Sequence, residues 1–182
     1  MLDPDPGDLV LAAGGDSAAL GRLLGRWKQL VYGVFERWEE PSAAAEATVQ
    51  LFVEALEKAG SYDPSVPFRE WLFSAAFRRF REARPVEQVP LARLRESSAA
   101  RTAFLRSAVA ALPPRGRALF LFTRVARLPL PVAAAATGLD EAGSRAALVS
   151  AMEELSRRLA PLLELLPEAT SPVTPPRAGE PA

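Results

Sequence analysis

The chain has 182 residues, in which 22 lysine and arginine residues balance 22 aspartate and glutamate residues, and it contains neither cysteine nor histidine. These two absences remove disulfides, thiolate and imidazole metal sites, thiol nucleophiles and the Ser-His-Asp triad. An enzyme is therefore not expected, and neither is a bound metal or cofactor. With 49% apolar residues the chain has enough material for a hydrophobic core, in one domain or two small ones.

The amino terminus is acidic, and no basic region precedes an apolar stretch. It therefore lacks the pattern of a secretory signal peptide, and no apolar run is long enough to span a bilayer. These features predict a soluble, cytoplasmic protein that makes no membrane contact. Residues 1–13 are interpreted as an acidic extension, and Asp3, Asp5 and Asp8 as a frayed terminus, because they lack the bidentate glutamate of a calcium loop.

Apolar residues recur at spacings of three and four throughout, and no strand pattern or internal repeat is present. Asp16 is a predicted cap for a first helix that extends to Phe35. A second helix is predicted to open at Pro41 with Ser42 as its cap. Its predicted apolar face consists of Val49, Phe52, Val53 and Leu56.

A third predicted helix begins near Pro67 and ends near Arg84, before a proline-bounded link over 85–100. Four helices are predicted after the link: from about Arg101 to the Leu112-Pro113-Pro114 break, over 115–127, over 130–137, and from a cap at Asp140 to about Leu166. Gly138 is a predicted helix C-cap. The proline-rich segment 167–182 is predicted to be a disordered tail. The predicted fold is therefore all-α, with two small helical domains.

Charge is unevenly distributed along this neutral chain. Residues 36–57 are mainly acidic, whereas residues 69–106 contain nine arginines. Such segments generally bind different partners. Solvated helix faces of mixed charge are the alternative interpretation.

Two patterns are typical of nucleic-acid binding. A helix, a short turn with Gly138 and a second helix occupy 130–158, which is the layout of a helix-turn-helix and also of an ordinary helical hairpin. Trp71 lies in an arginine-rich helix, where its ring is a platform for unstacked bases or a core side chain.

Three stretches, 14–38, 45–72 and 105–122, follow one another in the order found in one family. Their most specific elements are Tyr62-Asp63-Pro64, Pro67-Phe68, Trp71-Leu72 and Leu112-Pro113-Pro114-Arg115-x-Arg117. Together they resemble the extracytoplasmic-function group of the sigma-70 family of RNA polymerase sigma factors. The resemblance covers roughly residues 14–160.

The resemblance implies a protein that binds core RNA polymerase and directs promoter recognition and melting in transcription initiation. It implies that residues 14–84 correspond to sigma region 2, that 85–100 is a linker threading the polymerase, and that 101–166 form a region 4-like helix-turn-helix. The implied partners are the β′ clamp helices and β flap of the polymerase, promoter DNA and an anti-sigma factor. The implied contact residues are Glu46, Gln50 and Phe52 for polymerase; Tyr62, Phe68, Trp71, Arg78, Arg79 and Arg81 for the −10 strand; and Arg115, Ser144, Arg145 and Ser150 for the −35 duplex.

The predicted recognition helix is poor in cations. Between Asp140 and Glu154, Arg145 is the only basic residue, and Ser144 and Ser150 are the other polar candidates for contacts with DNA. Readers of duplex DNA usually neutralise several phosphates. An alternative function is therefore a degenerate sigma-like regulator, which binds polymerase or a protein partner without reading a −35 element.

Overall fold

The computed structural model describes residues 5–82, 89–95 and 97–164. Over these ranges it consists of eight α-helices and two short 3-10 helices, with no strand, which confirms the all-α prediction. In chain order these are α1 (Asp5–Ala13), α2 (Ser17–Glu36), α3 (Pro41–Glu57), η1 (Ala59–Ser61), α4 (Phe68–Glu82), η2 (Leu91–Arg95), α5 (Ser98–Ala110), α6 (Pro114–Arg124), α7 (Leu130–Thr137) and α8 (Glu141–Leu163).

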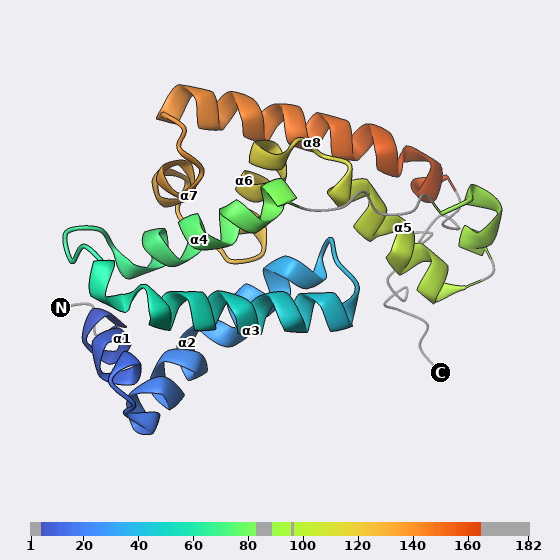
Figure 1. Ribbon diagram of the computed structural model, residues 1–182. Coiled ribbons are helices and arrows are strands. Elements are labelled where there is room, and N and C mark those ends of the chain that lie inside the picture. Colours follow the sequence, from blue (N-terminus) through green and yellow to red (C-terminus); the bar gives the residue numbers. More distant parts are fainter. Residues whose placement is uncertain (1–4, 83–88, 96, 165–182) are drawn as a thin grey trace, which may run out of the picture.

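The helices form layers (Figure 1). Helices α2 and α3 pack side by side on one side of the molecule, and α8 runs along the opposite side. Helices α4, α6 and α7 lie between them, with α4 packed against α7 and α6 packed against α8. None of the helices in the described ranges is long and apolar enough to cross a membrane.

The predicted N-caps Asp16 and Asp140 are confirmed. The carboxylate of Asp16 accepts hydrogen bonds from the backbone N–H groups of Ala18 and Ala19 at 2.9 and 3.0 Å, and Asp140 accepts one from Gly143 at 2.7 Å. The prediction for Ser42 is wrong: Glu40 is the N-cap of α3 without a side-chain bond, and Pro41 fills the first helical position. Proline suits that position because it lacks an N–H group that would be unpaired there. The predicted tail 167–182 lies outside the described residues.

The amino terminus differs from the prediction of a frayed segment. Asp5 and Asp8 lie on α1 and are buried, at 4% and 7% exposure. Arg26 donates to both carboxylates at 2.5 Å, and Arg22 donates to Asp8 at 2.6 Å. These ion pairs attach α1 to α2 and replace the water that the carboxylates lose on burial. Asp3 lies outside the described residues.

The pairing of Asp8 predicts a stability that depends on pH in the acid range. Hydrogen bonds from Arg22 and then Arg26 lower the pKa of Asp8 below its ordinary value, which is about 3.9. The folded state therefore binds this proton less readily, so the contribution to stability is present above pH ~4 and is lost as the pH falls through the lowered pKa. We expect Asp8→Asn to be less stable than the wild type at pH 7, with a difference that narrows on acidification in urea titrations. A difference that stays constant from pH 7 to pH 2.5 would contradict this.

The buried face of α3 also differs from the prediction. Leu51, Phe52 and Ala55 are directed into the core, whereas Val49 and Val53 are 61% and 48% exposed. The core packs against a different face of the helix from the one that the valine spacing indicates. Two valines are therefore left on the outer surface of α3.

The two predicted domains share one hydrophobic core. Phe122 of α6 makes edge contacts with Phe73 and Phe80 of α4, with ring centroids 4.9 and 5.7 Å apart, and all three side chains are essentially fully buried. The first unit, α1–α4, is thus in direct contact with the second, α5–α8. The residue boundaries of the domains stay a prediction.

Candidate polymerase and DNA interface

One polar surface links helices α3 and α4. Gln50 donates to Glu46 at 2.8 Å, and Arg79 donates to the side-chain oxygen of Gln50 at 2.8 Å. Arg78 donates to Glu54 at 2.7 Å. The predicted polymerase contacts Glu46 and Gln50 therefore lie next to the predicted −10 contacts Arg78 and Arg79. We call Glu46, Gln50, Glu54, Arg78 and Arg79 the α3–α4 polar surface.

Glu54 is the anion of this surface. Burial acts to raise its pKa, but hydrogen bonds from Lys58 and Arg78 together outweigh burial and lower the pKa. The carboxylate is thus held ionised between two cations. Because Arg78 is half exposed, with 52% of its side chain accessible, it can exchange this partner for a phosphate at little cost.

Three of the residues predicted to contact polymerase or the −10 strand lie in the interior. Phe52 and Phe68 are 5% and 0% exposed, and Tyr62 is 8% exposed and donates its hydroxyl to the carbonyl of Val66 at 2.5 Å. Buried rings of this kind cannot touch polymerase or DNA in this conformation, so their assignment as direct contacts is corrected to core positions. Tyr62 and Phe68 instead pack against Trp71, which is half-buried, with ring centroids 5.3 and 5.9 Å from that of Trp71. The side chain of Arg81 lies outside the described part of the chain.

The predicted helix-turn-helix is formed by α7, Gly138 and α8. Gly138 has φ +66°, the left-handed conformation that glycine adopts readily, and it ends α7 as predicted. Ser144 is fully buried and donates its hydroxyl to the carbonyl of Glu141 at 2.8 Å, so its assignment to duplex contact is corrected. Arg145 is exposed but pairs with Glu141 on its own helix, and Ser150 is exposed.

Apolar side chains occupy part of the outer surface of α8. Val149 and Met152 are 55% and 39% exposed. Neither can donate to a phosphate or a base edge. The composition of this surface favours a protein partner over duplex DNA.

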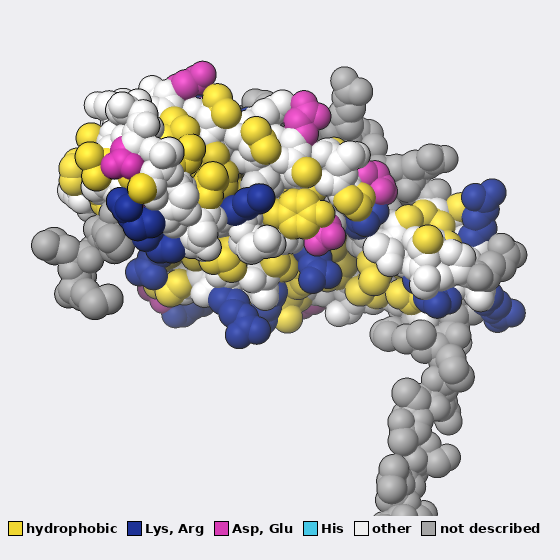
Figure 2. Space-filling model, turned by 90° about the horizontal axis from the view of Figure 1, so that it is seen from below, with side chains coloured by type: hydrophobic (Ala, Val, Ile, Leu, Met, Phe, Trp, Pro, Cys, Tyr) yellow, Lys and Arg dark blue, Asp and Glu magenta, His cyan; other side chains and the backbone are white. Residues whose placement is uncertain are grey.

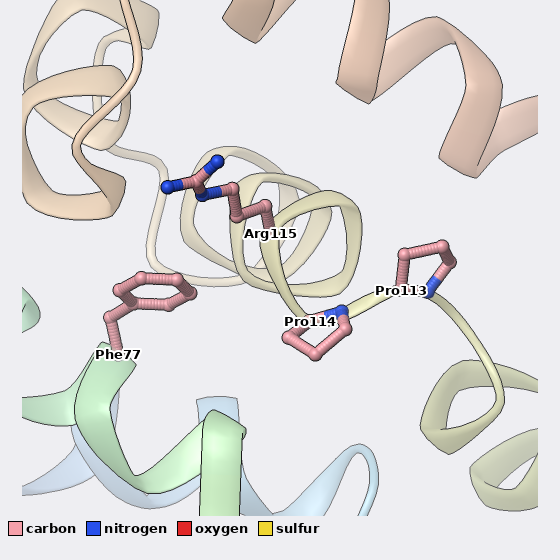
Figure 3. A pocket seen from close by; sticks show the side chains of 4 residues that line it. All are labelled: Phe77, Pro113, Pro114 and Arg115. Carbon is pink, nitrogen blue, oxygen red and sulfur yellow. The ribbon is translucent and has the colours of Figure 1, made fainter.

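Arg115 lies in a cleft between the two units. The cleft has a volume of about 440 Å³ and is lined by Phe77 of α4 and by Pro113, Pro114 and Arg115 at the start of α6. Figure 3 shows the Arg115 side chain extending toward the side of the cleft that Phe77 occupies, with the two proline rings beside it. Arg115 is exposed. Its charge is therefore accessible between the unit predicted to bind the −10 strand and the unit predicted to bind the −35 duplex.

Arg117 is a buried arginine with several structural contacts, and the sequence predicts no role for it beyond its motif. It is 4% exposed and donates to the carbonyls of Ala110 and Phe80 at 2.8 and 3.0 Å. Its guanidinium lies 4.6 Å from the centroid of the Trp38 ring. Burial lowers the pKa of Arg117, and nearby Glu39 partly offsets this. The only sequence signal is a cation within an otherwise apolar helix face, directly before Ala118 and Leu119.

The outer surface combines basic and apolar groups. The face seen in Figure 2 presents groups of lysine and arginine side chains separated by hydrophobic side chains. A surface of this composition suits a macromolecular partner with both anionic and apolar parts.

Comparison with known proteins places this geometry in a family context. No protein-family model and no curated protein sequence matches the chain. A solved structure does match: CnrH in complex with the cytosolic domain of CnrY, with 25% sequence identity, a TM-score of 0.68, and coverage of 89% of this chain and 98% of that chain. CnrH is an extracytoplasmic-function sigma factor, which is a non-enzymatic transcription factor, and CnrY is its anti-sigma factor. The chain therefore has the two-domain fold of an extracytoplasmic-function sigma factor, and the resemblance predicted from its motifs is confirmed.

Proposed function

We propose that the chain is a sigma factor that binds core RNA polymerase through the outer face of α3 and engages the melted −10 strand through α4. The observation that carries this proposal is the composition of that face of α3. Val49 and Val53 are exposed beside Glu46 and Gln50, so apolar contact area adjoins polar anchors. Contacts of both kinds are typical of specific protein interfaces.

Helix α4 supplies the second part of the proposed function. Trp71 keeps an accessible part of its ring, and Arg78 and Arg79 lie two helical turns further along the same helix. An aromatic platform next to cations is the arrangement that binds unpaired nucleotides. The fold match to CnrH, solved with CnrY, also supports a protein partner of the anti-sigma class for this chain.

The exposed valines of α3 test the polymerase face. We expect Val49→Asp to weaken binding to core RNA polymerase by about tenfold or more, because a carboxylate in an apolar contact costs at least ~1.4 kcal/mol. Val10→Asp on α1 is the matched control, since Val10 is 60% exposed and Val49 is 61% exposed. Fluorescence titration of labelled protein with core enzyme measures both. Equal affinities for the two variants would contradict this assignment of the polymerase face.

A second candidate function is a sigma-like regulator that does not read a −35 element. The observations in its favour are the burial of Ser144, the pairing of Arg145 with Glu141, and the exposure of Val149 on α8. Under this alternative the wild-type chain does not bind duplex DNA measurably.

Restoring cations to α8 tests this alternative. Ala146 and Val149 are both exposed, so Ala146→Arg with Val149→Arg adds charge without disturbing the core. We expect the double variant to gain duplex binding with a salt dependence steeper by roughly one to two phosphate contacts. Gel-shift titrations at several salt concentrations measure this gain. Tight, sequence-specific duplex binding by the wild type would refute the alternative.

A further inference from the structure

Three cations surround one carboxylate in the α3–α4 polar surface. The Oε1 atom of Glu54 accepts hydrogen bonds from Lys58, the C-cap of α3, and from Arg78 on α4, both at 2.7 Å. The Nη2 atom of Arg79 lies 4.0 Å from Oε2 of the same carboxylate, which is within ion-pair distance. Glu54 itself is largely enclosed, with 23% of its side chain exposed. One anion thus interacts with three cations.

These cations lie beside the aromatic ring of the proposed single-strand site. Arg78 follows Trp71 by seven residues on α4, a spacing that places both side chains on the same face of the helix. The side chains of Arg78 and Lys58 are both half exposed, so a phosphate can reach them. An aromatic ring and a cation on one face can bind a base and its phosphate together.

Glu54 occupies the donors that such a phosphate would use. Arginine binds carboxylate and phosphate groups through the same fork of N–H donors, so the two anions exclude each other at one guanidinium. The carboxylate also repels an approaching phosphate, because both groups are negatively charged and would lie close together. A strand that binds Arg78 must therefore displace Glu54 or accept its charge as a neighbour.

We propose that Glu54 is a built-in competitor of the nucleic-acid backbone, which holds Arg78 and Lys58 and so lowers the affinity of α4 for a single strand. Because exposed ion pairs are individually weak, this competition sets the strand affinity without blocking the site. Glu54 is thus an affinity-determining residue that makes no contact with the strand itself. The −10 strand as the ligand rests on the proposed function, whereas the competition for Arg78 can be measured without polymerase.

Removing the charge of the carboxylate tests the competition. Glu54→Gln keeps the size of the side chain and one acceptor oxygen. We expect the free full-length chain with this change to bind a labelled oligothymidine about three- to tenfold more tightly at low salt, which is the scale of one or two exposed ion pairs. The salt dependence is expected to steepen by about one phosphate contact. Anisotropy titrations at several salt concentrations measure both effects.

Glu57 on the same helix provides the charge-matched control. It is exposed, and no ion pair joins it to any other residue that the structure describes. Glu57→Gln changes the net charge of the chain by the same amount, and salt screens its effect on the distant phosphates, so we expect a change in affinity of less than about twofold. Equal gains from the two variants would overturn the proposal, because net charge alone would then account for them.

A double variant tests whether the gain depends on Arg78. In a chain that carries Arg78→Gln, the further change Glu54→Gln is expected to give less than half of the gain that it gives in the parent chain. An undiminished gain would overturn the proposal. A loss of affinity in Glu54→Gln would also overturn it, because Glu54 would then hold the arginine in place for the strand.

A second substitution covers a failure of the first variant to fold. If circular dichroism finds that Glu54→Gln loses its helices, Glu54→Asp carries the test, because it withdraws the carboxylate from Arg78 by one methylene group. It is expected to shift the affinity in the same direction by a smaller factor. If neither the wild type nor the folded variant binds oligothymidine measurably, the proposal is refuted, because the released cations then do not bind a nucleic-acid backbone.

The same variants in the polymerase complex separate this inference from the proposed function. With core RNA polymerase and a −10 single strand, Glu54→Gln is again expected to tighten strand binding. A gain with oligothymidine, together with a polymerase complex that binds no −10 strand, supports the competitor and contradicts the sigma function. Strand binding by the complex, with equal affinities of wild type and Glu54→Gln in both assays, refutes the competitor and leaves the sigma function standing.

Discussion

Replacing Phe122 with alanine is expected to lower the free energy of unfolding by about 3–5 kcal/mol. Phe122 is 0% exposed and contacts the rings of Phe73 and Phe80 on the opposite unit. The truncation therefore leaves a cavity in the core that both units share. Urea denaturation followed by circular dichroism measures the loss.

A neighbouring residue supplies the control for this experiment. Phe120 lies on the same helix but is only partly buried, so Phe120→Ala is expected to cost clearly less, about 1–2 kcal/mol, in line with the smaller area it buries. Equal losses of unfolding free energy for the two variants would contradict a distinct contribution of the contact between α4 and α6 to stability.

Replacing Trp71 with alanine is expected to weaken binding of a −10 single strand by the polymerase complex by about 5- to 150-fold. This range corresponds to the 1–3 kcal/mol that one stacked base contributes. Binding to core polymerase is expected to be unchanged, because Trp71 is on α4 and not on the outer face of α3. Anisotropy of a labelled oligonucleotide measures the strand affinity.

Trp27 provides a closely matched control. It is also half-buried, and its ring centroid lies 5.9 Å from that of Phe68, the same distance as for Trp71. Trp27→Ala therefore removes comparable aromatic packing against α4 while leaving every side chain of α4 unchanged. If both variants lose strand affinity equally, the effect of Trp71 is on packing and not on base stacking.

Features set by neighbouring residues could be predicted from the sequence. The caps at Asp16 and Asp140, and the left-handed Gly138 that ends α7, each depend on a few adjacent backbone groups. The family resemblance was predictable for a similar reason, since its motifs are short and follow one another in order. Glu46, Gln50 and Arg78, which the resemblance predicts as contacts, are exposed and Arg79 is partly buried; their contact roles stay predictions.

Features set by distant contacts could not be predicted in this way. Helix α1 contains Gly7, which disfavours a helix locally, yet its ion pairs with Arg22 and Arg26 on α2 hold it in place. The face of α3 that enters the core is chosen by its neighbours in the fold, so Val49 was assigned to the wrong side. The partners of Arg117 come from three separate segments, and no local pattern specifies such a contact.

Binding of the unmodified chain to core RNA polymerase, in competition with a housekeeping sigma factor, tests the central claim most directly. Labelled protein is titrated with core enzyme, and the unlabelled competitor is then added. The proposed function predicts nanomolar affinity and full displacement by the competitor. Absence of binding, or binding that the competitor leaves unchanged, would contradict a sigma role and leave only the likeness in fold.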